Sequence, residues 1–378
     1  MGVILPKTEQ ELSEAVAGAA GPLRIVGGGT RPIGKPVAGE VLSTAGLSGI
    51  TLYEPGALTL VAQAGTPLAE IEAVLAAENQ RLAFEPMDHR VLLGTDGTPT
   101  IGGVVAANAS GPRRIQVGAC RDHLLGVRFV DGMGTITKNG GRVMKNVTGY
   151  DLVKLMAGSW GTLGVLSEVS LKVLPIPEHE ATLIVHGADI GAGVATMSAA
   201  LGSPFDITGA AHFPLTAGGS ADTMLRVEGF EGSVAYRIEA LKALLAGHGD
   251  MNTVEGAVSA TAWQRVRDVD WFADTVDDVW RLSVKPGDAP DVVARMGAEA
   301  QVQLGWGGGL IWALLPEGTD LRARLGGFSG HATLIRASDA MRAKLPVFQP
   351  EAAPLAALSA GLRAKFDPRG VLNPGLMG

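Results

Sequence analysis

The stretch KNVTGYDLVKLMAGSWGTLGVLSEVSLK, residues 145–172, joins a short helix, a glycine-rich turn and an amphipathic strand without interruption. Thr148, with Asp151 three residues later, predicts a capped helix that ends at Gly158. From Val165 to Lys172 apolar and polar residues alternate, which predicts a strand with one solvated face. The three elements follow one another so closely that they form one structural unit.

The turn inside this unit has the composition of a cofactor-binding turn. Gly161 and Gly164 bracket it, and Val165 opens the strand directly afterwards. A glycine backbone can approach a flat ligand more closely than any side chain would allow. We therefore expect a planar cofactor to lie against this turn.

Composition excludes several classes of protein. The chain has 378 residues, 31 Lys and Arg against 38 Asp and Glu, and a net charge of −7, with no basic run longer than Arg113-Arg114. Length predicts two or three domains, and the charge argues against a nucleic-acid partner. The single Cys120 cannot form an internal disulfide or hold an iron–sulfur cluster, which needs about four thiolates. Any iron–sulfur chemistry would belong to another subunit.

The N-terminal sequence and the hydropathy predict where the protein works. MGVILPKTEQ lacks a basic start and a long apolar core, so we expect no signal peptide. No uncharged apolar stretch is long enough to span a bilayer. We expect a cytoplasmic protein, associated with the inner membrane only through partner subunits if at all.

Local patterns outline the organisation of the chain. A capping box at Thr8–Glu11 predicts a helix with Leu12 and Val16 buried, and strands are predicted at 23–26 and 59–64. Thr66-Pro67 predicts the start of a helix, and Asp131-Gly132 predicts a hairpin. Two prolines near residue 176 mark a boundary. The expected domains are 1–175, 178–345 and a C-terminal segment, 346–378, that returns to the first.

The first glycine loop, residues 27–36, fits neither of two well-known nucleotide motifs. Pro32 occupies the third glycine position of a dinucleotide-binding fingerprint, and Pro36 replaces the hydroxyl residue of a P-loop. What remains is a strand followed by residues whose N–H groups can form an anion nest. The alternative is an ordinary tight turn.

A second loop, which begins at Thr100, also has a composition suited to a phosphate site. From Thr100 to Gly111 the chain places many small residues and several hydroxyl or amide side chains within a dozen positions, and Gly118, Arg121 and Asp122 follow. Such a lining suits a diphosphate, whereas the alternative is an Ala/Gly helix that packs closely on a sheet. Three such loops in one chain favour the ligand.

These motifs, in this order, resemble the FAD-binding domain of the vanillyl-alcohol oxidase and p-cresol methylhydroxylase (PCMH) superfamily. The resemblance extends to the FAD-binding subunits of bacterial glycolate oxidases, which are related to D-lactate dehydrogenases. The residues that carry it are Gly27-Gly28-Gly29-Thr30, Thr100-Ile101-Gly102-Gly103, Val143 to Asp151, Gly161 to Val165, Trp280-Arg281-Leu282-Ser283, Trp306-Gly307-Gly308, Phe366-Asp367-Pro368 and Asn373-Pro374-Gly375. The likeness covers nearly the whole chain and is strongest up to residue 175.

The resemblance implies an α+β fold: a two-subdomain PCMH-type FAD-binding domain with a smaller α/β cap domain. Some relatives bind flavin covalently through a histidine where this chain has Thr30, so we expect non-covalent FAD. The implied cofactor-binding residues are Gly27, Gly28, Gly29, Thr30, Arg31, Thr100, Ile101, Gly102, Gly103, Asn108, Ser110, Gly111, Gly118, Arg121, Asp122, Gly161, Gly164, Val165 and Asn373.

No catalytic residue is assigned from the sequence. The seven histidines form no close pair with metal-ligand spacing, the nearest candidate being His331, so we expect no metal site. Oxidation of a 2-hydroxy acid needs a cation for the carboxylate, and Arg226, Arg281 and Arg336 are the candidates.

Two functional hypotheses follow, with a weaker third. In the first, the chain is an oxidoreductase subunit whose FAD relays electrons in a glycolate oxidase, with a second FAD-binding catalytic subunit and an iron–sulfur subunit as partners. In the second, it is a self-sufficient FAD-dependent D-2-hydroxy-acid dehydrogenase that uses the cap arginines. The third is a scaffold subunit with a degenerate flavin site.

Most tryptophans lie in the expected cap. Five of the six fall between Trp263 and Trp312. We expect core packing for them, while a substrate pocket or a partner-facing surface are the alternatives.

Overall fold

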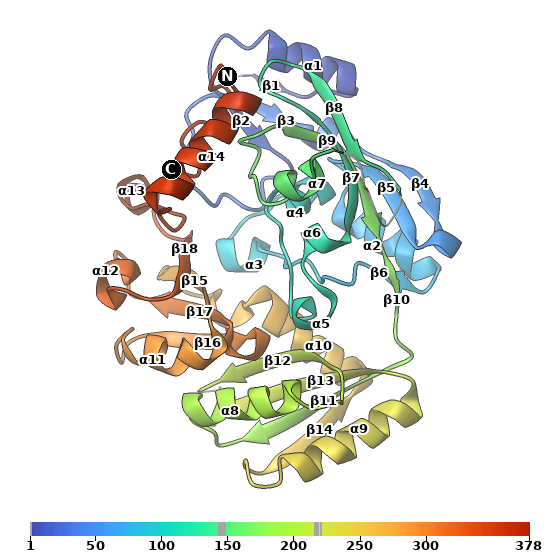
Figure 1. Cartoon of the computed structure of the whole chain (residues 1–378), viewed down its shortest axis with the longest axis vertical. Coiled ribbons are helices and arrows are strands. Elements are labelled where there is room, and N and C mark those ends of the chain that lie inside the picture. The colour runs from blue at the N-terminus through green and yellow to red at the C-terminus, as the bar shows by residue number, and fades with distance from the viewer. Residues whose placement is uncertain (1, 143–148, 215–218, 220) are drawn as a thin grey trace. The chain divides into compact units, whose positions relative to one another are not determined.

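A computed structural model describes residues 2–142, 149–214, 219 and 221–378 (Figure 1). The chain forms two compact units. Unit 1 comprises Met1–Ser110, Gly118–Ile176 and Pro350–Gly378, and unit 2 comprises Gly111–Val117 and Pro177–Gln349. Helices and strands mix in both units, which confirms the α+β class. The sequence did not predict that residues 111–117 pack with unit 2.

Unit 1 begins with a small parallel sheet. Its strands are β1 (Val3–Ile4), β2 (Leu23–Val26) and β3 (Glu40–Ser43), in the order β1-β3-β2. Helix α1 (Glu9–Ala17) is capped by Thr8, whose hydroxyl accepts from the Glu11 amide at 3.1 Å, and it buries Leu12 and Val16. The predicted strand 23–26 and the predicted capped helix are confirmed.

A five-stranded antiparallel sheet forms the rest of the unit 1 framework. It contains β4 (Ile50–Glu54), β5 (Thr59–Gln63), β7 (Leu124–Val130), β8 (Ile136–Gly140) and β9 (Val165–Lys172), in the order β4-β5-β9-β7-β8. The β7–β8 hairpin confirms the turn expected at Asp131-Gly132. The solvated face expected for β9 is present only in part: Glu168 and Lys172 are half-buried, whereas Ser170 between them is buried. β9 is the central strand of this sheet.

Helices cover this sheet and meet at its hydrophobic core. They include α2 (Leu68–Ala77), α4 (Ile101–Ala106) and α7 (Leu152–Met156), and shorter elements are α3 (Arg90–Leu93), α6 (Cys120–His123), β6 (Gln80–Arg81) and β10 (Leu174–Pro175). Asp151 caps α7 by accepting from the Lys154 amide at 3.1 Å. The predicted cap Thr148 lies outside the described residues. Thr66 donates to the Gln63 carbonyl and does not cap α2.

The C-terminal segment belongs to unit 1. After α14 (Ala353–Phe366) the chain runs beside β2: the Leu23 amide donates to the Val371 carbonyl at 2.7 Å, and the Asn373 amide donates to the Leu23 carbonyl at 3.0 Å. Val371 and Leu372 join the core formed by α1 and the small sheet. The C-terminus therefore completes the end of β2, where the first glycine loop begins.

Unit 2 is built on an eight-stranded sheet. The strands are β11 (His179–His186), β12 (Ile207–Phe213), β13 (Asp222–Gly229), β14 (Met251–Glu255), β15 (Asp278–Val284), β16 (Gln301–Gly305), β17 (Leu310–Leu315) and β18 (Gly330–Arg336), in the order β14-β11-β13-β12-β16-β17-β15-β18. The helices are α5 (Arg114–Val117), α8 (Ile190–Leu201), α9 (Glu231–Leu244), α10 (Gly256–Asp268), α11 (Ala289–Ala294), α12 (Leu321–Leu325) and α13 (Asp339–Lys344).

Helices pack on both faces of this sheet. Gly193 of α8 lies against the ring of His212 on one face, and Trp263 of α10 lies against Gly209 on the other. Trp280 and Trp312 are also buried, so core packing accounts for these three tryptophans. Trp271 is 38% exposed and lies at the edge of the core, where its ring centre is 5.4 Å from that of Phe213.

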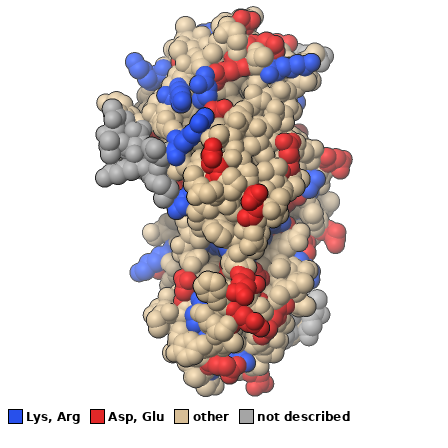
Figure 2. All heavy atoms as spheres, turned by 90° about the vertical axis from the view of Figure 1, so that its right-hand side faces the viewer, with Lys and Arg blue, Asp and Glu red and all other residues tan. Residues whose placement is uncertain are grey.

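The charge distribution has no concentrated basic region on the face drawn in Figure 2, where Lys and Arg lie among Asp and Glu over a largely uncharged surface. This agrees with the net charge of −7. None of the described helices combines the length and the hydropathy needed to cross a bilayer.

Buried His212 makes the stability of unit 2 depend on pH. Its Nδ1 bonds with Thr223 Oγ1 at 2.9 Å, its Nε2 has no partner among the described residues, and burial lowers its pKa to about 4. The unfolded chain therefore takes up the proton first, and stability falls as the pH drops below the ordinary histidine pKa, by about 2 kcal/mol between about pH 7 and about pH 5.

His212→Gln should weaken this dependence. We expect urea unfolding at the two pH values to show a smaller loss for His212→Gln than for the unchanged chain. Equal losses in both proteins would mean that other groups control the acid sensitivity.

Candidate functional site

The loop after β2 leaves a run of backbone amides open. Within the described part of the chain, the N–H groups of residues 28–31 donate to no protein acceptor. Consecutive amides of this kind form a concave donor surface that binds an anion such as phosphate. The loop therefore has the donor set for a diphosphate.

The same loop packs directly on a second loop, which explains its glycines. A Cβ atom on Gly28 would lie 1.5 Å from the Thr98 carbonyl oxygen, and one on Gly27 would lie 2.5 Å from Thr100 Oγ1. No side chain fits at such distances. The two loops, distant in sequence, are therefore held backbone to backbone.

Arg31 places a cation beside the open amides. Its Nε donates to His89 Nδ1 at 3.1 Å and its Nη2 donates to the Met87 carbonyl at 3.0 Å, and among the described residues no carboxylate pairs with it. Burial lowers the pKa of Arg31 to about 10, so it stays charged at neutral pH. A guanidinium held by neutral partners keeps its charge available for a phosphate group.

The amides at the start of α4 are used inside the protein, which corrects an expectation. Ile101 and Gly102 donate to backbone carbonyls just after β5 at 3.1 and 2.7 Å, and the Gly103 amide donates to Thr100 Oγ1 at 3.4 Å. These donors are not available to a diphosphate. Gly102 instead lets α4 pack on β5, since its Cβ would lie 2.6 Å from the Ala64 side chain.

Asn108 and Ser110 hold the next turn of the chain in place. Asn108 Oδ1 accepts from the Arg121 amide at 3.0 Å, and Ser110 Oγ accepts from the Cys120 amide at 2.9 Å. Asp122 accepts from the backbone at the start of the same turn, at 2.8 Å. These acceptor atoms therefore stabilise α6, and the Arg121 side chain is largely exposed.

Gly111 and Gly118 stand at the two ends of the segment that packs with unit 2. Gly118 lies in unit 1 with a φ of +89°. Gly111 lies in unit 2, where its carbonyl accepts from Trp306 Nε1 at 3.1 Å. Residues 111–117 thus interrupt the stretch that the sequence treated as one cofactor-binding region.

The turn between α7 and β9 has strained backbone and unpaired buried amides. Trp160 has a φ of +53°, which is rare for a bulky residue and is typical of functional sites. Gly161 and Leu163 are buried, and their amides donate to no acceptor in the described residues. A buried N–H without a partner costs about 1–3 kcal/mol, so these donors favour a ligand acceptor.

Asn373 joins this turn to β2. Its Oδ1 accepts from the Ile25 amide at 2.8 Å and its Nδ2 donates to the Trp160 carbonyl at 2.8 Å. Asn373 therefore positions the turn at the strand end where the first loop begins. Gly164 lies against Phe129, and Val165 is buried with α1, so both act through packing.

Comparisons with known proteins identify the family. The family model described as "FAD binding domain" matches residues 1–140. Glycolate oxidase subunit GlcE of Escherichia coli K12 is 34% identical over 371 residues, 97% of this chain and 95% of the relative. The chain belongs to the GlcE family. It is therefore a member of the FAD-binding oxidoreductases, and its cofactor is FAD.

Two further relatives show how far the similarity extends. Glycolate oxidase subunit GlcD of Bacillus subtilis is 34% identical over 141 residues, 37% of this chain and 28% of the relative. A solved alkyldihydroxyacetonephosphate synthase has a TM-score of 0.71 at 15% identity and covers 98% of this chain and 76% of its own, which shows the shared fold alone. The expected PCMH-type fold is confirmed.

The residues of unit 1 fit FAD. A diphosphate matches the open amides of residues 28–31 and the Arg31 guanidinium, and a flavin ring has acceptors for the buried amides of Gly161 and Leu163. The sequence placed Gly28 and Arg31 in the site, but it missed Thr98, Met87 and His89, which position them. No local pattern marks those three residues, because their role exists only in contact with the loop.

Arg31→Gln should weaken FAD binding. The change removes the positive charge beside the open amides, and we expect the dissociation constant of FAD to rise by about tenfold to a hundredfold. Flavin fluorescence titration of the apoprotein measures this. The matched control is Arg90→Gln, because Arg90 is exposed and pairs with Asp88 at 2.7 Å. An equal loss of FAD affinity in both variants would show that Arg31 does not bind the diphosphate.

Four charged residues of the unit 2 strands, Glu180, Arg226, Glu228 and Arg281, lie on one face of its sheet. Strand alternation and register assign them to the α10 face, where Thr182 faces Arg226, Arg281 faces Trp312 and Thr333, and Ser283 faces His331. The opposite face carries apolar residues such as Leu183, Leu225 and Ile311. That opposite face also holds buried His212 and Thr223. We call the α10 face the polar face of unit 2 because it carries the four charged residues.

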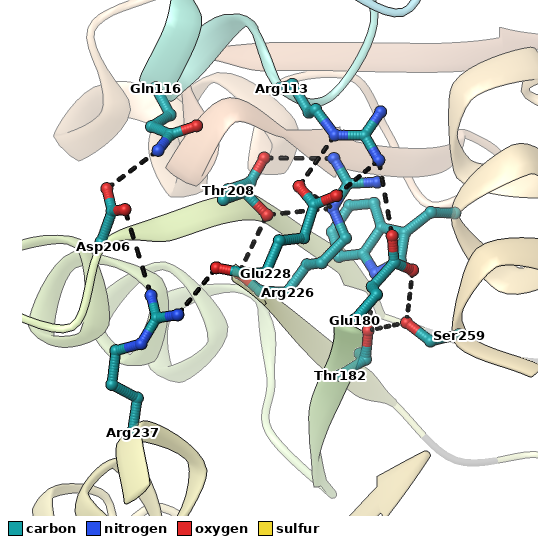
Figure 3. A network of polar contacts seen from close by, with 11 residues as sticks. Arg113, Gln116, Glu180, Thr182, Asp206, Thr208, Arg226, Glu228, Arg237 and Ser259 are labelled. Atoms are coloured by element: carbon teal, nitrogen blue, oxygen red, sulfur yellow. Dashed lines mark hydrogen bonds and ion pairs between the residues drawn. The ribbon is translucent and has the colours of Figure 1, made fainter. Parts of the chain in front are cut away.

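A charge-balanced network occupies one end of this face (Figure 3). Arg113 donates to both carboxylate oxygens of Glu228 at 2.8 Å and to Glu180 at 3.4 Å. Arg226 donates to Thr208 Oγ1 at 3.2 Å and lies over the Trp263 ring. Two arginines and two glutamates thus compensate one another, and burial raises the pKa of Glu180, an effect that the charge of Arg226 opposes.

Two of the predicted carboxylate-binding arginines are already engaged by the protein. Arg226 is 1% exposed and bound to Thr208, and Arg336 donates to the Asp277 carbonyl at 3.0 Å. Among the described residues no three His, Cys, Asp or Glu side chains are close enough to hold a metal ion.

Proposed function

We propose that this chain is the FAD-carrying subunit of a multi-subunit 2-hydroxy-acid oxidase that takes part in the oxidation of glycolate to glyoxylate. The observation that supports this most strongly is the extent of the GlcE match, which runs over 97% of the chain and so includes both units. The GlcD match covers 37%. The partners are a second FAD-binding subunit and an iron–sulfur subunit.

Bound FAD would accept the hydride that the substrate carbon loses. The protein's own contribution is to hold the cofactor through residues 28–31, Arg31, Gly161 and Leu163. Thr30 offers no ring nitrogen for a covalent bond to flavin, so binding is non-covalent. The single Cys120 is buried, which agrees with an iron–sulfur cluster carried by a partner.

A self-sufficient D-2-hydroxy-acid dehydrogenase is the second candidate. The observation in its favour is Arg281, a guanidinium on the polar face of unit 2 that has neither a carboxylate partner nor a hydrogen bond among the described residues. A cation of this kind is what the carboxylate of a 2-hydroxy acid requires.

Anaerobic mixing with substrate distinguishes the two candidates. We expect the purified chain to contain FAD, to be reduced slowly by glycolate or D-lactate alone, and to be reduced rapidly once it is co-purified with its partner subunits. Rapid bleaching of the isolated chain would favour the self-sufficient enzyme. A colourless chain that takes up no FAD would overturn both candidates and leave the scaffold hypothesis.

A further inference from the structure

The Arg31 guanidinium is held by the protein along one edge. Its Nε donates to His89 Nδ1 at 3.1 Å, and its Nη2 donates to the Met87 carbonyl at 3.0 Å. Its Nη1 has no acceptor among the described residues and lies beside the first turn of α4, where a Cβ on Gly103 would be 3.6 Å from it. Two neutral partners therefore fix the guanidinium and leave its Nη1 donors available beside the glycine loops.

The contact with His89 needs a neutral imidazole. A guanidinium carries hydrogen on all of its nitrogens, so His89 Nδ1 can only accept from Arg31, and the hydrogen of the neutral ring is on Nε2. Nδ1 also lies 3.2 Å from the Met87 carbonyl oxygen, the acceptor that Arg31 Nη2 uses. One ring nitrogen thus lies between a donor and an acceptor, and its protonation decides which of the two it can bond.

Protonation of His89 would break this arrangement. An Nδ1–H group would oppose the N–H of Arg31 Nε, and it would donate to the Met87 carbonyl in competition with Arg31 Nη2. His89 is buried, so the new positive charge would lie beside the guanidinium with little water to screen it. Both effects weaken the hold of the protein on Arg31.

The other titratable groups around this pair keep their charge state near neutral pH. Asp88 and Arg90, on either side of His89 in the chain, form an ion pair at 2.7 Å. Burial lowers the pKa of Arg31 to about 10, an effect that the charge of Asp88 opposes, so Arg31 stays charged. Burial raises the pKa of the Cys120 thiol, which therefore stays neutral. Histidine is the side chain that ordinarily titrates near neutral pH, which makes His89 the titrating group of this set.

We propose that His89 is a positioning residue for FAD: its neutral imidazole orients Arg31 toward the diphosphate, and its protonation weakens the binding of the cofactor. Retention of FAD then depends on pH through a single side chain of unit 1. The inference requires FAD as the cofactor, but it requires neither a particular substrate nor a partner subunit.

The pH dependence of ligand affinity tests this inference without turnover. Apoprotein of the full-length chain is titrated at about pH 8 and about pH 5.5 with FAD, with ADP-ribose, which keeps the diphosphate, and with riboflavin, which lacks it. We expect the dissociation constants of FAD and ADP-ribose to rise by about tenfold in acid and that of riboflavin to stay constant. The thermal midpoint at each pH shows whether the chain is folded.

Variants show whether His89 acts through Arg31. His89→Asn keeps an acceptor but takes up no proton in this range, so it should bind FAD well at both pH values. His89→Leu removes the acceptor and should weaken FAD binding by about tenfold at both. Arg31→Gln should also abolish the pH dependence. The matched control is His179→Asn, which should preserve it, because His179 lies in unit 2 and contacts Glu255 at 3.3 Å.

Three results would overturn the proposal. They are an equal acid loss of FAD affinity in His89→Asn and the unchanged chain, an equal acid loss for riboflavin and FAD, and tighter FAD binding in acid. The last would mean that the imidazolium attracts the diphosphate directly. A pH dependence that disappears in His89→Asn and Arg31→Gln but persists in His179→Asn would support the proposal. Failure of the assembled complex to oxidise glycolate would overturn the proposed function alone.

Discussion

Gly28→Ala should abolish stable FAD binding. The new Cβ atom would lie 1.5 Å from the Thr98 carbonyl oxygen and 2.6 Å from its carbonyl carbon, and both are backbone atoms that cannot rotate away. The loop of residues 27–31 must then separate from the loop that contains Thr98. Because the open amides and Arg31 lie on this loop, we expect FAD affinity to fall by at least about a hundredfold and unfolding free energy by about 1–3 kcal/mol.

Gly29→Ala is the matched control for this change. Gly29 is the next residue of the same loop and has a φ of +73°, and no atom of the described residues lies within 4 Å of an added Cβ. The substitution costs only the left-handed conformation, about 1–2 kcal/mol, and leaves the loop contact intact. Flavin absorbance of the purified variants and titration of the apoproteins measure both effects. If Gly28→Ala retained FAD as well as Gly29→Ala, the contact between the two loops would not be what shapes the site.

Arg113→Met should destabilise unit 2 strongly. Arg113 is 8% exposed and makes two bonds of 2.8 Å to Glu228. Its removal therefore takes one positive charge away from Glu228 and Glu180. Breaking a buried ion pair from one side costs about 3–5 kcal/mol because an uncompensated charge remains. Chemical denaturation, followed by tryptophan fluorescence, measures the loss.

A control variant and a double variant show whether the lost stability comes from the uncompensated charge or from lost packing. Gln116→Ala removes a bond of 3.0 Å to the exposed Asp206 from the same segment, and we expect a change below about 0.5 kcal/mol. Arg113→Met with Glu228→Gln should recover part of the stability, because the uncompensated carboxylate is gone. In Arg113→Met the carboxylates lose a cation and their folded pKa values rise, so its deficit should shrink as the pH falls. A deficit that is independent of pH and unchanged in the double variant would argue for lost packing.

Arg113 comes from a stretch of sequence that was expected to bind the cofactor, but it belongs to the ion-pair network of unit 2. The reason is that residues 111–117 pack with unit 2. Ser110 and Gly118 belong to unit 1, whereas Arg113 and Arg114 between them belong to unit 2. The composition changes after Ser110, from small residues to Pro112, Arg113 and Arg114, but a change of composition does not say which unit the segment packs with. Only the contacts of Arg113 with Glu228 and of Arg114 with Trp306 show that this segment packs with unit 2.

The predicted cofactor residues have two different roles in the structure. Gly28 and Arg31, which the sequence predicted to bind the cofactor, have backbone amides that no protein acceptor uses among the described residues. The Gly102 amide and the side chains of Asn108 and Asn373 form hydrogen bonds with the protein's own backbone. These residues therefore support the site indirectly. A sequence motif does not distinguish a residue that binds a ligand from one that holds the binding loop, because both require the same residue types.

The unit from Lys145 to Lys172 shows what the sequence by itself determined. Alternation, a cap and two glycines predicted the helix, the turn and the strand, since such patterns reflect local backbone preferences. The motifs also identified FAD as the cofactor. The tertiary structure decided that β9 is central. It also decided that, among the residues it describes, the amides of Gly161 and Leu163 have no acceptor and Arg281 has no carboxylate partner. Whether a donor or a charge is satisfied depends on residues distant in the chain, and only the folded protein brings those together.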